Sequence, residues 1–570
     1  MKSKSQFRIR LIFLLIAAIA LVLVLNLYMV QIIKGETYRN VAERQYVTPS
    51  KSIFERGKIY FTNKDGTTLS AATLKSGFNL SINPSKLKDS LDAYKKLSSI
   101  VPIDEAKFFS KASKKNDPHE DIEKRISEEQ AEKISLLKIP GVELSRERWR
   151  VYPGEKLAAN TLGFVGYSGD TFSGRYGLER YYDDTLKRDD GVAYVNFFAE
   201  IFSNINKVVS KDNQREGDII TSIEPTAQSF FEKEVGGISD KWRSKMTLGV
   251  IINPVNGEVY SMAVNPTFDP NLYGSETDVN VFSNPIVEGV FEMGSVIKAL
   301  TMAAGIDFGS VTASTTYNDK GSITLNNSTI SNYDHKGNGV IDMQEVLNKS
   351  VNTGAAFVVN KMGKENFAKY MVDFGLGSET GIDLPNESNG NITNLKSPRD
   401  IEYATASFGQ GIAMTPMITI RALSSLANGG MMITPHIVNN IDYKLGLSKN
   451  ISFEGEDRRV IKKETSEEIT RMLVKTVDDA LVGGTVKIPN YSVAAKTGTA
   501  QIAKQGGGGY YDDKYLHSFF GYFPAYNPRF LIFLLTLEPK GAPYAADTLT
   551  KPFMDTVKFL INYYEIPPDR

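Results

Sequence analysis

Residues 291–304 read FEMGSVIKALTMAA and place Ser295 three positions before Lys298. Residues three apart lie on one face of a helix, so the lysine amine can reach the serine hydroxyl. The small and apolar residues after Gly294 predict a buried helix that begins at the serine. Burial lowers the pKa of a lysine and makes a neutral amine base possible near pH 7. The stretch therefore predicts a serine nucleophile that a lysine activates.

The S-x-x-K spacing also occurs twice elsewhere, at Ser85/Lys88 and at Ser135/Lys138. Neither copy lies in an apolar helical pattern, and chance matches on solvated helices explain both. The setting of Ser295, rather than the spacing alone, singles it out.

Two further motifs follow in order. The first is S-x-N, at Ser350, Val351 and Asn352. Its hydroxyl can relay a proton and its amide can bind a substrate peptide. The second follows a strand-like segment and comprises Lys496, Thr497, Gly498 and Thr499. A cation, two hydroxyls and a glycine on one strand predict an anion-binding edge, on which Gly498 lets a substrate backbone approach closely. S-x-x-K, S-x-N and K-T-G in this order are typical of penicillin-binding proteins and class A β-lactamases.

Composition narrows the chemistry. The chain has 570 residues, which suggests two or three domains, and 66 basic residues balance 66 acidic ones. Zero net charge gives no support to nucleic-acid binding. The absence of cysteine excludes thiol nucleophiles, disulfides and cysteine metal sites, and four histidines leave little for a metal centre or a Ser-His-Asp triad. We expect no metal and no cofactor.

The N-terminus predicts a membrane anchor. Basic residues within positions 1–10 precede an apolar run at 11–33, which suffices to cross a bilayer as a helix. The basic side is expected in the cytoplasm. A cleaved signal peptide is the alternative, but no small-x-small cleavage site follows. We therefore expect a single-pass protein of the cytoplasmic membrane, with its N-terminus inside and its catalytic domain extracytoplasmic.

The remainder divides near residues 211–216. Residues 34–215 mix short strands with polar helices, and a charged pattern predicts a helix over 119–137. Residues 216–570 have apolar strands at both ends, around 246–253 and 529–537, and a helical middle. This order predicts an α/β or α+β domain whose sheet closes late in the sequence.

The chain resembles class B penicillin-binding proteins, the monofunctional D,D-transpeptidases of the FtsI and penicillin-binding protein 2 family. Residues 374–385, 407–416 and 517–524 are similar to characteristic segments of that catalytic domain. Residues 56–60, 150–153 and 176–179 are similar to its N-terminal pedestal. The resemblance implies a serine β-lactamase/transpeptidase-like domain at 216–570, a pedestal of the dimerisation type at 34–215, and one transmembrane helix. Met293 departs from the family, which usually has proline there.

The resemblance also implies roles. Ser295 would attack the penultimate D-Ala carbonyl of a stem peptide, and Lys298 would take its proton. Ser350 and Lys496 would protonate the departing D-Ala, and Asn352 would bind the donor peptide. Substrate binding, including recognition of the terminal carboxylate, would fall to the K-T-G strand: Lys496, Thr497, Gly498 and Thr499. Backbone N–H groups of Ser295 and Thr499 would hold the oxyanion. β-Lactams, which mimic D-Ala-D-Ala, would acylate Ser295.

Other activities remain open. A D,D-carboxypeptidase would pass the acyl group to water. A class A β-lactamase would need a deacylating glutamate after S-x-N, whereas Glu345 precedes it. A penicillin sensor or an inactive scaffold are the non-enzymatic alternatives. No segment resembles a glycosyltransferase, so we expect a SEDS-type glycosyltransferase partner among division or elongation proteins; residues 38–45 slightly favour division. His517 is expected at the edge of the cleft.

Overall fold

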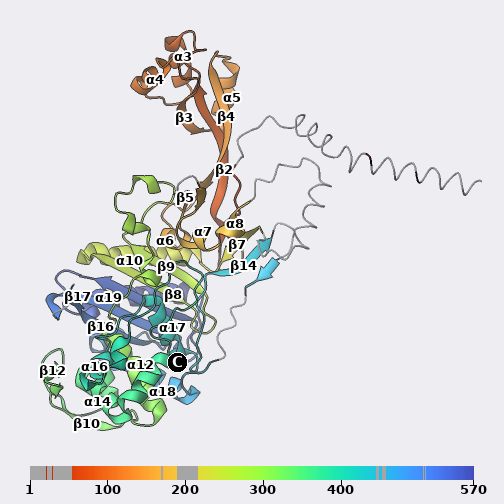
Figure 1. Ribbon diagram of the computed structural model, residues 1–570. Coiled ribbons are helices and arrows are strands. Elements are labelled where there is room, and N and C mark those ends of the chain that lie inside the picture. The colour runs from red at the N-terminus through yellow and green to blue at the C-terminus, as the bar shows by residue number, and fades with distance from the viewer. Residues whose placement is uncertain are drawn as a thin grey trace, which may run out of the picture. The chain divides into compact units, whose positions relative to one another are not determined.

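The computed structural model describes residues 54–168, 171–188, 216–443, 448–451, 458–504, 506 and 509–570, with positions 21 and 29 (Figure 1). The predicted membrane anchor at 11–33 lies outside the described residues, apart from these two isolated positions. Among the described helices, none combines the length and the apolar character that a bilayer crossing needs. The described chain forms two compact units, which we take in turn.

The first unit comprises residues 76–148 of the described chain and has a core of its own. Strand β2 (Thr68–Ile82) pairs with β3 (Glu120–Ile126) and with β4 (Val142–Val151). Three helices pack with them: α3 (Ser90–Ser98), α4 (Glu105–Ala112) and α5 (Glu128–Leu136).

The helix predicted over 119–137 is wrong in its first half. Residues 120–126 form β3, which pairs antiparallel with β2. The helix α5 starts only after Ser127, whose side chain accepts from the Gln130 backbone N–H while Gln130 bonds back to Ser127. This reciprocal capping fixes the helix start.

The second unit draws its described residues from Glu55–Lys75, Trp149–Asp189 and Tyr194–Arg570. Its centre is a five-stranded antiparallel sheet in the order β16, β17, β18, β8, β9. The strands are β16 (Ala494–Ala503), β17 (Tyr510–Phe523), β18 (Phe530–Leu537), β8 (Met246–Ile252) and β9 (Val259–Asn265).

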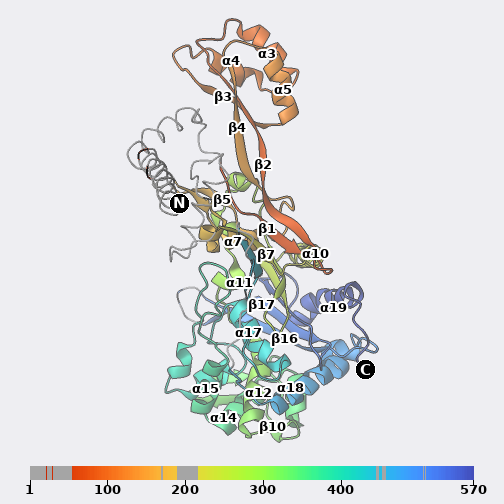
Figure 2. The same ribbon diagram turned by 90° about the vertical axis from the view of Figure 1, so that its right-hand side faces the viewer.

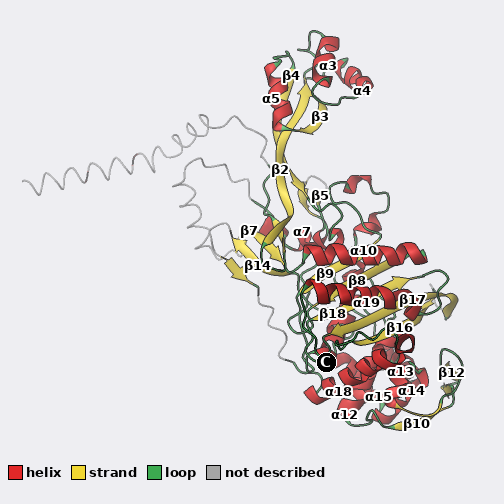
Figure 3. Cartoon of the chain, turned by 180° about the vertical axis from the view of Figure 1, so that it is seen from behind, coloured by secondary structure: helices red, strands yellow, loops and turns green. Residues whose placement is uncertain are grey.

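Both faces of this sheet are buried. Side chains alternate along a strand, so Ile532 and Leu534 of β18 enter one apolar cluster and Leu531 and Phe533 enter another. Helices α10 (Pro225–Trp242) and α19 (Ala545–Tyr563) cover the first face (Figure 3). The prediction of an α/β or α+β domain whose sheet closes late in the sequence is confirmed, with β16, β17 and β18 completing the sheet that β8 and β9 begin.

A group of helices packs on the other face (Figure 2). It contains α11 (Pro285–Glu288), α12 (Ile297–Phe308), α13 (Met343–Asn348), α14 (Asn352–Met362), α15 (Lys364–Asp373), α16 (Asp400–Ala406), α17 (Pro416–Ala427) and α18 (Lys463–Lys475). Two small two-stranded sheets accompany these helices. They pair β10 (Thr316–Asp319) with β13 (Gly339–Asp342), and β11 (Ser322–Leu325) with β12 (Ser328–Ser331).

Strands from distant parts of the sequence meet in a second sheet. β1 (Ile59–Thr62) pairs antiparallel with β2 and parallel with β7 (Gly217–Thr221). β7 in turn pairs antiparallel with β14 (Val438–Tyr443), which pairs with β15 (Ser448–Asn450). Short elements nearby in sequence are α6 (Ala159–Leu162), β5 (Val165–Ser168), β6 (Thr171–Gly174), α7 (Gly177–Tyr181) and α8 (Asp183–Leu186).

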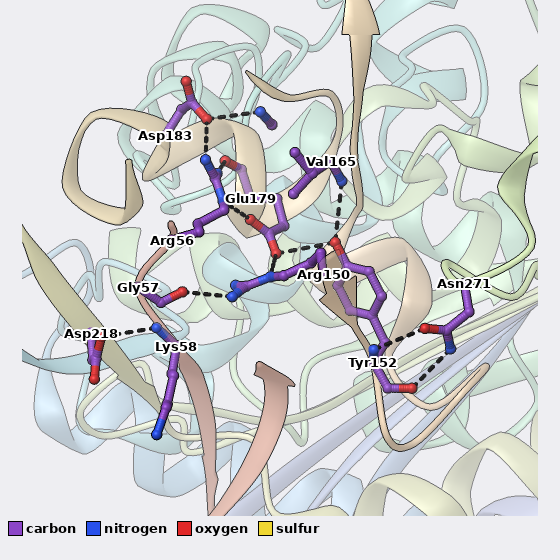
Figure 4. Close-up of polar contacts among 11 residues, drawn as sticks. Arg56, Gly57, Lys58, Arg150, Tyr152, Val165, Glu179, Asp183, Asp218 and Asn271 are labelled. Atoms are coloured by element: carbon purple, nitrogen blue, oxygen red, sulfur yellow. Dashed lines mark hydrogen bonds and ion pairs between the residues drawn. The ribbon is translucent and has the colours of Figure 1, made fainter. Parts of the chain in front are cut away.

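A buried ionic cluster ties these early segments together (Figure 4). The Glu179 carboxylate, on α7, accepts from Arg56 Nε and Arg150 Nε, both at 2.6 Å, and from the Tyr152 hydroxyl at 3.1 Å. The Asn271 side chain pairs with both the N–H and the carbonyl of Tyr152, each at 2.9 Å. One carboxylate thus fixes segments that are more than a hundred residues apart.

Candidate active site

Ser295 lies in a turn of 3₁₀ helix, Gly294–Val296, that leads directly into α12. The α-helix therefore begins two residues after the serine, slightly later than predicted. Gly294 has a left-handed backbone (φ +66°), and a Cβ there would lie 3.0 Å from the Thr499 carbonyl. Ser295 is half-buried between two buried neighbours. The turn holds the serine next to strand β16.

The segment 407–411 packs against this turn. Gly294 N–H donates to the Gly409 carbonyl at 3.2 Å, and a Cβ on Gly409 would meet the Gly294 carbonyl at 2.3 Å. The Thr301 hydroxyl on α12 donates to the Ser407 carbonyl at 2.8 Å. The close approach of Gly294 gives a physical reason for a glycine at position 409.

Lys298 lies one turn along the helix with only 1% of its surface exposed. Its Nζ donates to the Asn352 side-chain oxygen at 2.7 Å and to the Ser350 carbonyl at 2.5 Å, and lies 3.2 Å from the Ser350 hydroxyl. Burial, and secondly the charge of Lys496, hold the pKa of Lys298 well below its usual range. In the described part of the chain no hydrogen bond joins Lys298 to Ser295, so taking the serine proton requires one of these bonds to be exchanged.

Ser350 stands between two amines. Its hydroxyl lies 3.2 Å from Lys298 Nζ and accepts from Lys496 Nζ at 3.0 Å. The Ser350 backbone is left-handed (φ +54°), a conformation that costs energy in a residue with a side chain. A hydroxyl in this position can pass a proton between the two lysines.

Lys496 begins the third motif on β16, the edge strand of the central sheet. It is 3% exposed, and burial lowers its pKa to about 7. Thr497 and Thr499 are partly exposed on the same strand. The Thr499 hydroxyl accepts from Ala545 N–H, at the start of α19, at 3.1 Å. Among the described strands, none pairs with the outer side of β16, as the predicted substrate edge requires.

Gly498 is expected to make room for a substrate backbone, but its close neighbours are other parts of the protein. A Cβ at Gly498 would lie 2.4 Å from the Ser518 hydroxyl, 2.9 Å from the Met293 carbonyl and 3.0 Å from the Val296 nitrogen. The residue is buried. The space that its missing side chain frees is thus filled by the turn that carries Ser295.

Asn352 already uses both ends of its side-chain amide. The oxygen accepts from Lys298, and the nitrogen donates to the Ser331 carbonyl at 2.9 Å. One of its two N–H groups remains for a substrate. Sequence analysis missed Ser331, because a backbone carbonyl carries no motif.

His517 is not at an exposed edge. It is 0% exposed, its Nδ1 lies 2.9 Å from the Thr548 hydroxyl, and burial lowers its pKa to about 4. The two other S-x-x-K copies, at 85–88 and 135–138, have exposed serines and lysines. Among the described residues no group of three or more His, Asp or Glu side chains is placed to hold a metal ion.

Two protein families match the sequence of this chain. The family "Penicillin binding protein transpeptidase domain" matches residues 247–557, and "Penicillin-binding Protein dimerisation domain" matches residues 53–221. Stage V sporulation protein D of Bacillus subtilis is 30% identical, over 97% of this chain and 85% of its own length.

Two further proteins are similar. A peptidoglycan D,D-transpeptidase FtsI homolog of Mesostigma viride is 26% identical over 98% of this chain and 96% of its own length. The crystal structure of penicillin-binding protein 3 from Mycobacterium tuberculosis with aztreonam has a TM-score of 0.65 and 27% identity, over 75% of this chain and 92% of that one. The chain therefore belongs to the penicillin-binding proteins, in the class B group that joins a dimerisation-type domain to a serine D,D-transpeptidase domain.

Proposed function

We propose that this protein cross-links peptidoglycan stem peptides by D,D-transpeptidation through an acyl-enzyme on Ser295. The observation that carries the proposal is the Ser350 hydroxyl between two buried lysines, one of them on the helix into which the turn of Ser295 leads. A neutral Lys298 is a base that needs no histidine or cysteine, and the chain has no cysteine. Relatives bear the name peptidoglycan D,D-transpeptidase, and a similar structure contains aztreonam.

In the first half of the reaction, the Ser295 hydroxyl adds to the carbonyl of the penultimate D-Ala, and its proton passes to Lys298. Backbone N–H groups of Ser295 and Thr499 stabilise the oxyanion, and such donors contribute about 3–4 kcal/mol each. The carbon–nitrogen bond then breaks. The departing D-Ala takes a proton that Lys298 returns through Ser350, and Lys496 stabilises that hydroxyl.

In the second half, the amine of another stem peptide adds to the ester. The new carbon–nitrogen bond replaces the bond to Ser295, whose oxygen regains its proton by the same relay. Lys496, Thr497 and Thr499 bind the carboxylate of the donor in the first half, and Asn352 binds its peptide amide. β-Lactams use the first half and stop at the acyl-enzyme.

We further propose that residues 11–33 anchor the protein in the cytoplasmic membrane, with the catalytic unit outside. The support is the length of the apolar run and the basic residues before it. A SEDS-type glycosyltransferase of the division machinery would supply the glycan. Co-purification with division and elongation polymerases tests this partner, and exclusive capture of the elongation polymerase would overturn it.

Labelling with a fluorescent penicillin tests the acylation. Wild type and Ser85→Ala, which alters an exposed S-x-x-K serine, should be labelled, and Ser295→Ala should not. Equal labelling of all three would contradict the proposal. With a synthetic pentapeptide and a D-amino acid acceptor, the amide product identifies a transpeptidase, whereas exclusive release of the tetrapeptide acid identifies a carboxypeptidase.

A further inference from the structure

Asp319, at the end of β10, is a buried carboxylate outside the three motifs, with only 2% of its surface exposed. Its Oδ1 accepts from the Thr353 hydroxyl at 2.7 Å and from Gly321 N–H at 2.9 Å. Its Oδ2 accepts from the side-chain nitrogens of Asn332 at 2.9 Å and Asn338 at 2.7 Å. Burial raises the pKa of Asp319, but these donors outweigh it and hold the pKa below its usual range. A charged carboxylate that accepts this many hydrogen bonds is held firmly in one position.

The Asp319 contacts reach both flanks of Asn352. Thr353 follows Asn352 in the first turn of α14. Asn332 follows Ser331, whose carbonyl accepts from the Asn352 side chain at 2.9 Å. Thr353 N–H also donates to the Asn332 side-chain oxygen at 3.3 Å. One carboxylate therefore holds the side chains of Thr353 and Asn332, the residues that follow Asn352 and its hydrogen-bond partner Ser331.

The orientation of the Asn352 amide matters because its two ends are nearly equal in size and opposite in polarity. With the nitrogen on Ser331, the oxygen faces Lys298 and accepts from its Nζ at 2.7 Å. With the amide turned over, two N–H donors would face the amine that must accept the serine proton. The Ser331 carbonyl favours the first orientation, and Asp319 holds the side chain of the next residue, Asn332.

We propose that Asp319 is a positioning residue of the acylation site, which clamps Thr353 and Asn332 and thereby keeps the Asn352 side-chain oxygen toward Lys298. The inference rests on the proposed function, since it concerns the acylation of Ser295. Asp319 acts through Asn352 and contacts no substrate.

The test separates the rate of acylation from binding. Stopped-flow labelling with a fluorescent penicillin yields the Kd, the acylation rate at saturation and the fraction of protein labelled. For Asp319→Asn we expect the saturating rate to fall on the order of 10- to 100-fold, with little change in Kd or in labelled fraction. The control is Asp342→Asn, in the paired strand β13. Asp342 caps α13 by accepting from Glu345 N–H, and asparagine caps equally well, so the rate should stay at the wild-type value.

A second pair covers the case in which Asp319→Asn does not fold. Thr353→Val keeps the shape of the side chain but removes the hydroxyl that donates to Asp319, whereas Thr353→Ser keeps the hydroxyl. We expect slow acylation in the valine variant and recovery of most of the rate in the serine variant.

The outcomes are distinct. A reduced labelled fraction with a wild-type rate in Asp319→Asn or Thr353→Val would mean that Asp319 only stabilises the fold, and would overturn the proposal. Equal rates in Thr353→Val and Thr353→Ser would overturn it as well. Absence of labelling in wild type would instead contradict the proposed function.

Discussion

The pKa of Lys496 lies close to physiological pH. Burial lowers its pKa to about 7, and no carboxylate among the described residues pairs with its Nζ, which donates to the Ser350 hydroxyl and the Thr497 carbonyl, both at 3.0 Å. In the proposed reaction, its ammonium form would attract the carboxylate of a donor peptide or penicillin. The charge at this position therefore depends on pH near 7.

A pH dependence of binding follows. Below pH 7 Lys496 is protonated, and as the pH rises through about 7 it loses the charge that binds the carboxylate. The Kd for a penicillin, measured by stopped-flow labelling between pH 6 and 9, should increase above pH 7 by up to about tenfold per pH unit. In Lys496→Arg the guanidinium stays charged, so the increase should disappear. The same increase in both proteins would assign it to another group.

At the scale of residues, the sequence predicts which side chains form the site but not the conformation of their backbone. The order of the motifs indicates that Lys298, Ser350 and Lys496 share a site, and the structure brings their side chains together. The left-handed backbone of Ser350 and the donors around Asp319 have no local signal. They depend on contacts between segments that the sequence does not place relative to each other.

At the scale of elements, the site depends on how closely β16 approaches the turn of Ser295. Gly498 makes that approach possible, because every larger residue would collide with the Ser518 hydroxyl and with the backbone of Met293 and Val296. The sequence indicates a close approach at Gly498 but not its partner. A pattern on one strand cannot tell a substrate backbone from the backbone of the protein.

Gly498→Ala tests this packing. The added methyl should separate β16 from the turn, lower the free energy of unfolding by about 1–3 kcal/mol and slow acylation of Ser295. Gly237→Ala is the matched control, since Gly237 lies in α10 and no atom beyond its chain neighbours and its own helix backbone lies within 4 Å of the added carbon. That variant should gain about 0.5–1 kcal/mol and label normally. A stable, fully active Gly498→Ala would show that β16 tolerates displacement.

The sequence predicts a helix over the first half of 119–137, where the structure has the strand β3. Ile122 and Ile126 are four residues apart, a spacing that fits one face of a helix. They also lie an even number of residues apart, which fits one face of a strand. In β3 both isoleucines contribute to the same core, and pairing with β2 decides in favour of the strand.

At the scale of the whole molecule, stability depends on Glu179 and its two arginines. Burial raises the pKa of Glu179, but the charges of Arg150 and Arg56 outweigh it and hold the pKa below its usual range. Loss of the charge would leave Arg150 without its carboxylate and Arg56 with Asp183 alone, and breaking a buried ion pair typically costs about 3–5 kcal/mol.

Glu179→Gln should therefore lower the melting temperature at pH 7. Because the folded pKa lies below the unfolded value of about 4.5, the contribution of Glu179 is present above that pH and is lost as the pH falls through the folded pKa. The difference from wild type should shrink in acid, as melting curves between pH 3 and 7 would reveal. Glu467→Gln is the control, because its ion pair with Lys463 is largely exposed. Equal melting temperatures for wild type and Glu179→Gln at pH 7 would contradict this role.

The division into two units gives a second prediction at this scale. Residues 76–148 have their own core, and their ends are close together, since Arg148 Nε donates to the Ser76 hydroxyl at 3.2 Å. Replacing residues 77–147 by a short glycine-serine link should leave a folded protein that a penicillin acylates at the wild-type rate. Circular dichroism and labelling kinetics would measure both properties. A folded protein that labels slowly would assign these residues a part in acylation.

The strand pairing of β1 imposes an order on folding during synthesis. β1 can pair with β2, which follows it directly, but its parallel neighbour β7 begins only at Gly217, and β14, the next strand of the sheet, begins at Val438. The 76–148 unit needs no later segment for its core and can form soon after its last residue emerges. For a growing chain, the sheet that contains β1 therefore stays incomplete until the segment of β14 has been synthesised. Until then its unpaired strand edges are open to pairing with other chains.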